Sequence, residues 1–585
     1  MSNSSRLRRG CESGSIDRRA ALGGAPIDAA LRSLLAWVAC LLAPAWLVAA
    51  EVLPGEEAPH APGGAPVVAE PARRGPLAFR AWFDPAVRDA PASGRLVVYV
   101  LPAPFIGRDP GRGIGVGPTR PVFAVDVSDM RPGQAVVIDD SADAFPSPPS
   151  KLPPGRYLAR VVLDLQRISG DWHREPGNLT GEPVEFTIRP NGDGPGTLEV
   201  RLDYPVQPRP ERNFAGVEFF ETSSPLLSAF SGREVKLRAA LILPDNYRAD
   251  RKYAAIYDVP GFGGTHREAY QFARGREAYA TANPAARELN GEAFEIFLNP
   301  DSPYGHTLFC DSEVNGPWGR ALVEELIPAL EAKYPLLARP EARLLRGHSS
   351  GGWSTLWLAT EYPHVFGATW SSSPDPVDFR RFQRVDLYAQ DNFFRLTNPD
   401  GTPDHAIPSC ISGGRAVSTI EDEVRVDEVI GPGRTSGQQW AAWQSCWGRR
   451  GPDGNARPLF DVDTGAINRE EAETYRRFDI VDRLRRDPER FLPIFRDRVR
   501  VIVGDRDDWD LHLAVGLLRD ELARLCGSEN TPGGAGYIKI VRGHDHSSIF
   551  DAPELRSVPG EMLEHLRLHG LIGEAPPAGE RPRAP

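Results

Sequence analysis

A serine bracketed by glycines is the first feature of the sequence that could carry chemistry. The run Gly347–Gly351 reads Gly-His-Ser-Ser-Gly and fits the G-x-S-x-G pattern, with apolar Leu344–Leu345 before it and a helical segment running to Tyr362 behind it. Such a run forms a sharp strand-to-helix turn in which glycines avoid collisions with neighbouring backbone and the central serine stands exposed. The pattern predicts that Ser349 is a nucleophile; the alternative is a plain glycine turn.

A serine hydroxyl needs a base within hydrogen-bond reach before it can attack. Two histidines follow the late apolar run Tyr537–Ile540, at His544 and His546. A histidine just past a late strand lies at the edge of the sheet where such a base belongs. We expect His544 to be the base; His546 is the alternative, and an exposed polar loop is the remaining interpretation.

Three carboxylates follow the buried-strand pattern that ends at Gly504, namely Asp505, Asp507 and Asp508. One of them should orient the histidine, because the order nucleophile, acid, histidine is typical of this arrangement. We expect Asp507. Asp505 comes while the chain is still leaving the sheet, and Asp508 should point the other way in an extended loop because successive side chains alternate.

Backbone amides are the expected donors to a negatively charged oxygen in the reaction. The amide of Ser350 follows the nucleophile directly, and a second donor is expected from the glycine-rich loop Pro260–Gly264, which comes after a predicted strand. We name Phe262 and Gly263 as the residues that supply it.

Strand-like and helical segments alternate in the part of the chain that holds these residues. The helical stretch Trp318–Lys333 carries one apolar stripe. Alternation of this kind predicts an α/β fold with a mostly parallel sheet covered on both faces, spanning residues 230–570. Residues 375–490 break the rhythm and are expected to be an insertion. The strand-like runs are Ala254–Val259, Phe294–Leu298, Arg343–Leu345, Phe366–Trp370, Val499–Val503 and Tyr537–Val541.

The segment 76–215 has a different texture, with short alternating apolar runs separated by Pro, Gly and Asp turns. Runs of this length predict a smaller, all-β, sandwich-like domain ahead of the α/β domain.

The start of the chain resembles a secretory signal. Six arginines precede the apolar run Leu34–Ala49, which ends in small residues. We expect residues 1–50 to be removed and the protein to be secreted or periplasmic in a bacterium, without a stable membrane span; a retained anchor helix is the alternative. Residues 51–75 are expected to be a Pro/Gly/Ala-rich linker, and 574–585 a disordered tail.

Composition limits the partners. The formal charge of −11 and a pI near 5.7 argue against a general nucleic-acid or anionic-membrane binder. The cysteines show no metal-ligand spacing, so no metal and no cofactor are expected. In an exported protein we expect Cys410 and Cys446 to form a disulfide that closes the 375–490 segment.

Between residues 230 and 570 the chain resembles the putative-esterase family of α/β-hydrolases, which includes enterochelin esterases and S-formylglutathione hydrolases. The resemblance implies a serine esterase that works through an acyl-enzyme, and Asp507 stands at the family's usual spacing. An all-β domain before the catalytic one is also similar to enterochelin esterases, so 76–215 would help to form a substrate cleft. The chain departs from relatives at Pro260, where they often carry His, and at Ser350, where many carry Met. The residues that carry the resemblance are Leu241–Tyr247, Pro260–Gly264, Trp318, Glu324–Pro328, the serine turn with Tyr362–Pro363 and Phe366–Gly367, Gly504–Asp507 and Gly543–His544.

Two other functions remain open from the sequence. One is acyl transfer to a sugar or lipid acceptor, and the other is a non-catalytic extracellular binding protein on a hydrolase scaffold. The expected substrate of the esterase is a small-molecule or glycan-linked ester. Three tryptophans of the insertion, Trp440, Trp443 and Trp447, could stack on such a ligand or form a small core.

Overall fold

The computed structural model describes residues 67–68, 75–102, 120–171, 174–211, 214–396, 405–526 and 534–573. The predicted signal at 1–50, almost all of the predicted linker at 51–75 and the predicted tail at 574–585 lie outside these ranges. Within them, no helix combines the length and the apolar character needed to cross a membrane.

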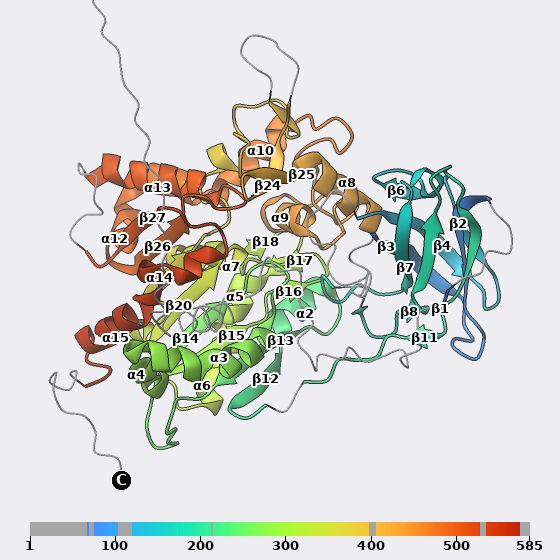
Figure 1. Cartoon of the computed structure of the whole chain (residues 1–585). Helices are drawn as coiled ribbons and strands as arrows, with labels where there is room; N and C mark the ends of the chain where they lie inside the picture. The colour runs from blue at the N-terminus through green and yellow to red at the C-terminus, as the bar shows by residue number, and fades with distance from the viewer. Residues whose placement is uncertain are drawn as a thin grey trace, which may run out of the picture. The chain divides into compact units, whose positions relative to one another are not determined.

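An eight-stranded sheet forms the centre of the C-terminal part (Figure 1). The first two strand pairs are antiparallel, and the remaining five pairs are parallel. The predicted α/β organisation with a mostly parallel sheet is therefore confirmed. In spatial order the strands are β12 (Val217–Ser223), β13 (Lys236–Ile242), β15 (Ala293–Leu298), β14 (Ala254–Val259), β20 (Arg343–His348), β21 (Ala368–Ser372), β26 (Val499–Gly504) and β27 (Tyr537–Val541).

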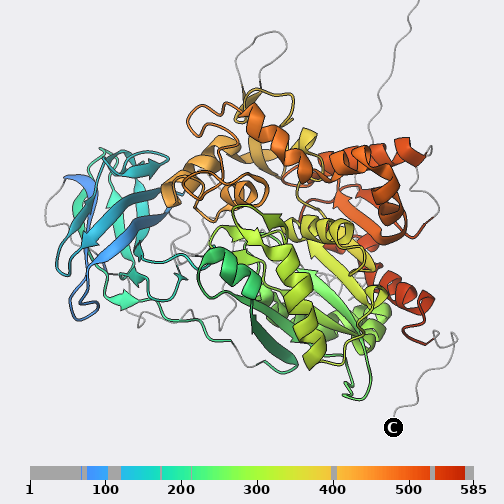
Figure 2. The ribbon, with the colours of Figure 1, turned by 180° about the vertical axis from the view of Figure 1, so that it is seen from behind.

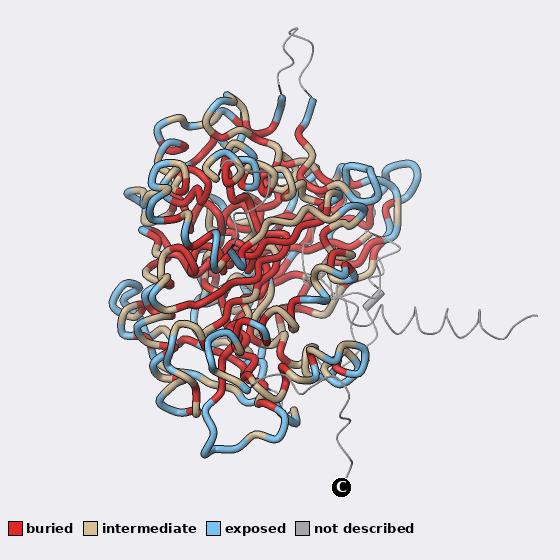
Figure 3. Tube along the Cα trace, turned by 90° about the vertical axis from the view of Figure 1, so that its left-hand side faces the viewer, coloured by how far each residue is buried: buried red, intermediate tan, exposed pale blue. Residues whose placement is uncertain are grey.

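The central strands are apolar on both faces because helices cover both. In β14, Tyr257 and Val259 pack into one core and Ala254 and Ile256 into another. Figure 3 shows that buried chain concentrates along these strands, whereas exposed chain lies in the peripheral loops. The near-continuous apolar runs seen in the sequence are what two-sided burial of parallel strands requires.

The helices divide between the two faces of the sheet, as the opposite views of Figures 1 and 2 show. The predicted helix Trp318–Lys333 is present as α5 and α6 joined by a π-turn at Leu322–Leu326. One face carries α3 (Ala269–Ala282), α4 (Pro284–Glu292) and α15 (Val558–Leu568). The other carries α5 (Trp318–Ala321), α6 (Ile327–Lys333), α7 (Ser350–Glu361), α12 (Pro488–Arg498) and α13 (Leu511–Cys526).

The segment predicted as an insertion lies between β21 and β26 and is folded in its described residues. Its apolar side chains join the core around α7, β26 and α13. It contains β22 (Arg395–Leu396), β23 (His405–Ala406), β24 (Pro408–Ser412), β25 (Arg415–Thr419), α8 (Ile420–Ile430), α9 (Gln439–Trp447), α10 (Arg469–Thr474) and α11 (Ile480–Arg486).

Between Gly75 and Pro205 the described elements are strands, apart from one short 3-10 helix at Pro149–Lys151. They form two sheets around a shared apolar core. One sheet contains β1 (Val67–Val68), β9 (Val184–Ile188), β7 (Gly155–Asp164), β3 (Ala92–Pro102), β4 (Val122–Met130) and β6 (Asp143–Phe145), with β8 (Leu179–Thr180) and β11 (Tyr204–Pro205) beside it; the other contains β10 (Pro195–Arg201), β2 (Gly75–Trp82) and β5 (Val136–Ile138).

A charged triplet crosses the central sheet on its α3 side. Arg346 of β20 lies 2.7 Å from Asp258 and 2.8 Å from Glu295, which belong to the neighbouring strands β14 and β15. Burial raises the pKa of both carboxyls, and Arg346 counteracts that rise. The arginine therefore stabilises the charged form of two buried carboxyls inside the sheet.

Replacing this arginine should destabilise the fold in a pH-dependent way. We expect Arg346→Met to lower the free energy of unfolding by about 3 kcal/mol at pH 8, because it leaves two buried carboxylates without a counter-charge. Their folded-state pKa values would rise further above the unfolded values, so the loss should shrink as the pH falls and the folded protein takes up protons. Urea unfolding at pH 8 and pH 5 measures both effects.

The control is Arg320→Met, because Arg320 pairs with Glu324 on an exposed helix surface. This exposed pair should contribute little, because solvent screens the attraction between the two charges. Equal losses in the two variants, or a loss that grows at pH 5, would contradict the role assigned to Arg346.

Candidate active site

Ser349 occupies a strained turn between β20 and α7. Its backbone has φ 58° and ψ −126°, a left-handed conformation that costs free energy for a residue with a side chain. The Ser349 amide donates to the Ser372 carbonyl at 3.0 Å, and the Asp375 amide donates to the Ser349 carbonyl at 3.2 Å. The predicted strand–turn–helix geometry around Ser349 is present, and these backbone hydrogen bonds stabilise its strained conformation.

The two flanking glycines allow the turn to close. A Cβ atom on Gly347 would lie 2.3 Å from the Gly351 carbonyl oxygen, and one on Gly351 would lie 1.8 Å from the Val259 carbonyl oxygen. Both distances are far below van der Waals contact. The glycines therefore let α7 begin directly against the end of β14, beside the glycine-rich loop.

Asp507 is hydrogen-bonded to His546. Nδ1 of His546 lies 2.6 Å from Oδ2 of Asp507, and both side chains are buried. The ring of His546 stands 4.4 Å from that of His348, the residue before Ser349, and 4.7 Å from that of Trp509. The histidine–carboxylate pair thus lies beside the serine turn, with Nδ1 engaged by Asp507 and Nε2 left available.

The environment of His546 favours its protonated form. Burial opposes a positive charge on the ring, but the carboxylates of Asp507, Asp508 and Asp375 outweigh burial and raise the pKa of His546. His348 behaves in the opposite way, because burial and the neighbouring His546 lower its pKa well below the usual value. Of the two adjacent rings, His546 is the one suited to accept a proton.

The expected pairing of Asp507 with His544 is wrong. Nδ1 of His544 donates to the Ser548 carbonyl oxygen at 2.8 Å, within a turn. The His544 backbone packs so closely on the end of β26 that a Cβ on Gly504 would lie 2.1 Å from its carbonyl oxygen. The chain turns at Gly543, where φ is 83°, and the second histidine, rather than the first, reaches Asp507.

Each of the three aspartates weighed for the acid has its own partner. Asp505 accepts from the Gly543 amide at 2.6 Å, and Asp508 accepts from the His546 amide at 3.3 Å. Only Asp507 contacts an imidazole ring among the three. Asp505 and Asp508 therefore shape the loop that carries His546, whereas Asp507 holds its ring.

The glycine-rich loop after β14 is fixed by a histidine that the sequence analysis missed. Leu308 donates its amide to Nδ1 of His306 at 3.0 Å, so Nε2 carries the proton and donates to the Pro260 carbonyl oxygen at 2.8 Å. Burial lowers the pKa of His306 to about 4, so it is neutral at physiological pH. Its position in a short hairpin, far from any motif, gave no signal in the sequence.

The two backbone segments that hold the expected oxyanion donors lie close together in space. The loop that holds Phe262 and Gly263 follows Val259, whose carbonyl meets the first turn of α7 where Ser350 lies. Gly263 has φ 74° and lines a cavity, whereas the Ser350 side chain is fully buried. The backbone arrangement is compatible with two amides converging beside Ser349.

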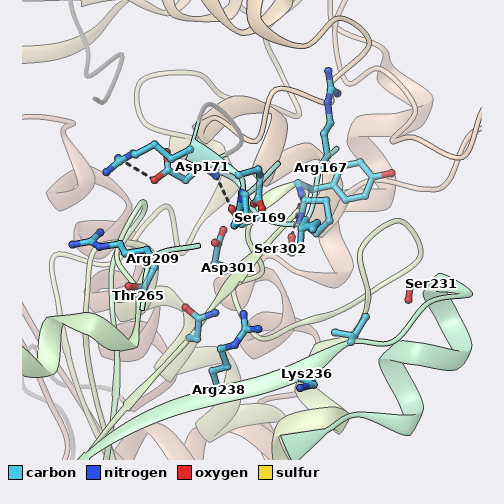
Figure 4. A pocket seen from close by; sticks show the side chains of 18 of the residues that line it. Arg167, Ser169, Asp171, Arg209, Ser231, Lys236, Arg238, Thr265, Asp301 and Ser302 are labelled. Carbon is cyan, nitrogen blue, oxygen red and sulfur yellow. Dashed lines mark hydrogen bonds and ion pairs between the residues drawn. The ribbon is translucent and has the colours of Figure 1, made fainter. Parts of the chain in front are cut away.

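A cavity of about 1320 Å³ adjoins this loop at Gly263 and Thr265. Figure 4 shows Ser169 and Asp171 across it from Arg238 and Lys236, with Asp301 between them. Nine arginine and lysine residues and six carboxylates line it, although the whole chain carries a net charge of −11. Ser349 and His546 do not line the cavity, so it extends the site from the side of the glycine-rich loop.

The three tryptophans of α9 are core residues. Trp440, Trp443 and Trp447 are each at most 3% exposed, and Trp443 and Trp447 stack with ring centres 5.7 Å apart. Trp447 also packs 5.1 Å from Trp353 of α7. Of the two interpretations weighed from the sequence, the small core is therefore the one that applies.

The expected disulfide between Cys410 and Cys446 is wrong, because the four cysteines in the described residues are free thiols. The Cys446 thiol donates instead to the His306 carbonyl oxygen at 3.2 Å, and the Cys310 thiol lies 3.6 Å from the Cys446 carbonyl oxygen. Cys410 lies in β24, which packs on the Asp508 loop through the Ile411 amide. The described residues hold no cluster of side chains suited to a metal ion.

Residues 307–489 match the model of a family described as putative esterase, in agreement with the resemblance stated from the sequence. No curated protein matches the chain.

Solved structures with a similar fold include three serine hydrolases or esterases. Their TM-scores are low, so the fold assignment rests on the strand order and helix placement given above. They are the substrate-bound fluorophosphonate-binding serine hydrolase F of Staphylococcus aureus (12% identity, 60% of this chain and 99% of that chain, TM-score 0.33), a ferulic acid esterase (13%, 60% and 98%, 0.35) and an S-formylglutathione hydrolase from Agrobacterium tumefaciens (13%, 61% and 97%, 0.32).

The histidine assignment can be checked without a substrate. In Asp507→Asn the charge nearest the ring is lost, so the pKa of His546 should fall by about one unit or more. NMR titration of histidine labelled at Cε1, with His546→Gln to assign the signal, measures the change. His544→Gln should leave the His546 titration unchanged. If Asp507→Asn shifts the titration of His544 rather than that of His546, the pairing is contradicted.

Proposed function

Since the chain is a carboxylic ester hydrolase with a putative-esterase segment at 307–489, we propose that it cleaves its substrate through a Ser349–His546–Asp507 triad. The observation that carries this proposal is the 2.6 Å bond from Asp507 to Nδ1 of His546, beside the strained turn of Ser349. That bond fixes the tautomer in which Nε2 is the base.

The proposed reaction has two halves. Nε2 of His546 takes the proton of Ser349 as Oγ attacks the ester carbonyl, and Asp507 stabilises the imidazolium that forms. His546 then returns the proton to the leaving alcohol, and an acyl-enzyme remains on Ser349. Water, activated by the same histidine, releases the acid and restores Ser349.

Backbone amides are the proposed donors to the oxyanion, from Ser350 and from Phe262 or Gly263. His306 supports this role by holding the Pro260 carbonyl, which orients the peptide that enters the glycine-rich loop. This chemistry needs no metal and no cofactor.

We also propose that residues 76–215 form a domain whose edge makes one wall of the substrate cleft. Contacts of this segment with the hydrolase part support the idea: the Gly170 amide donates to Asp301 at 2.8 Å, and Arg167 donates to Thr435 Oγ1 at 2.6 Å. Arg167, Thr435 and Asp301 line the cavity beside Gly263, as do Ser169 and Asp171 on either side of Gly170. Export from the cytoplasm, supported by the arginine-rich start and the apolar run Leu34–Ala49, belongs to the same proposal.

Covalent labelling tests the triad. A fluorophosphonate probe should modify Ser349, and Ser349→Ala should lose both the label and the hydrolysis of p-nitrophenyl acetate, by a factor on the order of 10⁶ in kcat. His546→Gln should also abolish most of the turnover. His544→Gln should stay within about tenfold of the native kcat, because it loses one neutral hydrogen bond worth about 1 kcal/mol.

Circular dichroism and thermal melting show whether each variant is folded. Native turnover in Ser349→Ala would refute the esterase mechanism as a whole. A larger loss in His544→Gln than in His546→Gln would refute only the choice of the base.

The charge of the cleft leads to a proposal on the substrate. Arg233 and Arg450 line the cavity, and no ion pair involves either side chain within the described part of the chain. Phe230, an exposed residue of the same lining, has the Arg450 guanidinium 5.6 Å from its ring centre. We propose that the cleft favours esters with an anionic group on the part remote from the carbonyl, since a positive cleft concentrates anions.

Matched esters that differ only in a remote carboxylate test this preference. The double variant Arg233→Ala/Arg450→Ala should raise KM for the anionic ester by about tenfold and leave the neutral ester unchanged, with the difference shrinking at high salt. Arg320→Ala, an exposed arginine that does not line the cavity, is the control. An equal rise in KM for both esters would contradict a charge-based preference.

A further inference from the structure

One buried carboxylate near Ser349 is not used by the triad. Asp375 follows β21 and is 3% exposed. Its Oδ2 accepts from Ser350 Oγ at 2.6 Å and from Trp443 Nε1 at 2.8 Å, and its amide donates to the Ser349 carbonyl at 3.2 Å. A single residue thus contacts the backbone of the proposed nucleophile, the side chain after it, and helix α9 of the insertion.

We propose that Asp375 is a positioning residue of the esterase site, which fixes the first turn of α7 and supports the positive charge on His546. This inference rests on the proposed triad. Asp375 does not touch the substrate; it acts through Ser350 and through the field at the histidine.

The hydrogen bonds supply the first half of the argument. Ser350 is fully buried and is fixed at two points, because its hydroxyl donates to Asp375 and its carbonyl accepts from Ser354 Oγ at 2.7 Å. The peptide between Ser349 and Ser350 carries the amide proposed to face the oxyanion. A residue without a hydroxyl at position 350 would leave the carboxylate without this donor. The serine at this position and the carboxylate of Asp375 therefore form a matched pair.

The charge supplies the second half. Burial raises the pKa of Asp375 to about 6, while His546 lowers it and Asp507 raises it. The same coupling is one of the causes that raise the pKa of His546, after Asp507 and Asp508. Two further groups lie beside the histidine: His348, whose pKa is lowered well below the usual value by burial, and the carboxylate of Asp545, the preceding residue, which interacts with His546. Trp443 of α9 and Ser350 of α7, which pack directly on the carboxyl, carry no charge.

Asparagine separates the two roles. In Asp375→Asn the amide oxygen can still accept from Ser350 and Trp443, but the charge is gone. His546 should then lose its proton at lower pH, so the acid limb of the kcat/KM profile should move down by on the order of half a pH unit. Asp375→Ala removes the acceptor as well, and kcat should fall at least about tenfold at the pH optimum with KM nearly unchanged, because positioning of one oxyanion donor is lost.

The measurement is a pH profile of p-nitrophenyl acetate hydrolysis from pH 5 to 9 for both variants. Asp427→Asn is the matched control, because Asp427 is a buried carboxylate of α8 that accepts from the Ala441 amide and is not coupled to the histidine. Its profile should coincide with that of the native protein. NMR titration of His546 in Asp375→Asn reads the same charge effect without turnover, so it stands even if the esterase assignment fails.

An unchanged acid limb and an unchanged His546 titration in Asp375→Asn would overturn the proposal, as would the same displacement in Asp427→Asn. If Asp375→Ala does not fold, the asparagine variant still decides the question. Absence of fluorophosphonate labelling in the native protein would instead refute the esterase function on which the inference rests.

Discussion

The close approach of α7 to the carboxyl ends of β14 and β21 is the constraint on which the site depends. Glycine at positions 347 and 351 permits it, since any side chain at Gly351 would collide with the Val259 carbonyl. Ser349 bears the resulting backbone strain, and hydrogen bonds to Ser372 and Asp375 balance it. Because the glycine-rich loop continues from Val259, the same contact sets the distance between that loop and the serine. Strain at a single residue, offset by the packing around it, therefore positions the proposed nucleophile and the proposed oxyanion donors together.

Three carboxylates lie around His546 in the same closely packed region. Three carboxylates, those of Asp507, Asp508 and Asp375, outweigh the burial that would otherwise keep the ring neutral. Each of them has a hydrogen-bond donor of its own from backbone or side chain, so none is left as an isolated buried charge. The arrangement gives the histidine a field that favours its cationic form, which is the form that the proposed acyl transfer would generate transiently.

Several features could be predicted from the sequence because they leave a local pattern. Residue spacing and apolar periodicity predict the serine turn, the alternation of strands and helices, and the helix that begins at Trp318. The choice between His544 and His546 was not, since it depends on the turn at Gly543 and on the bond from its amide to Asp505, neither of which has a periodic signature. The error over Cys446 has a similar cause: its thiol faces the hairpin of His306, a contact between segments far apart in sequence. Asp375 and His306 belong to the same class of residue, because only the folded chain brings them to the site.

The contacts of α9 have a consequence for how this chain could be recombined with its relatives. Trp443 donates to Asp375 beneath the serine turn, and Cys446 donates to the carbonyl of His306, the residue that holds Pro260 at the start of the glycine-rich loop. One helix of the insertion thus touches the supports of both halves of the site. The insertion is therefore not an exchangeable module: a chimera that replaced it with a shorter loop would keep every residue of the proposed triad and yet lose the hydrogen bonds that α9 makes to Asp375 and to His306.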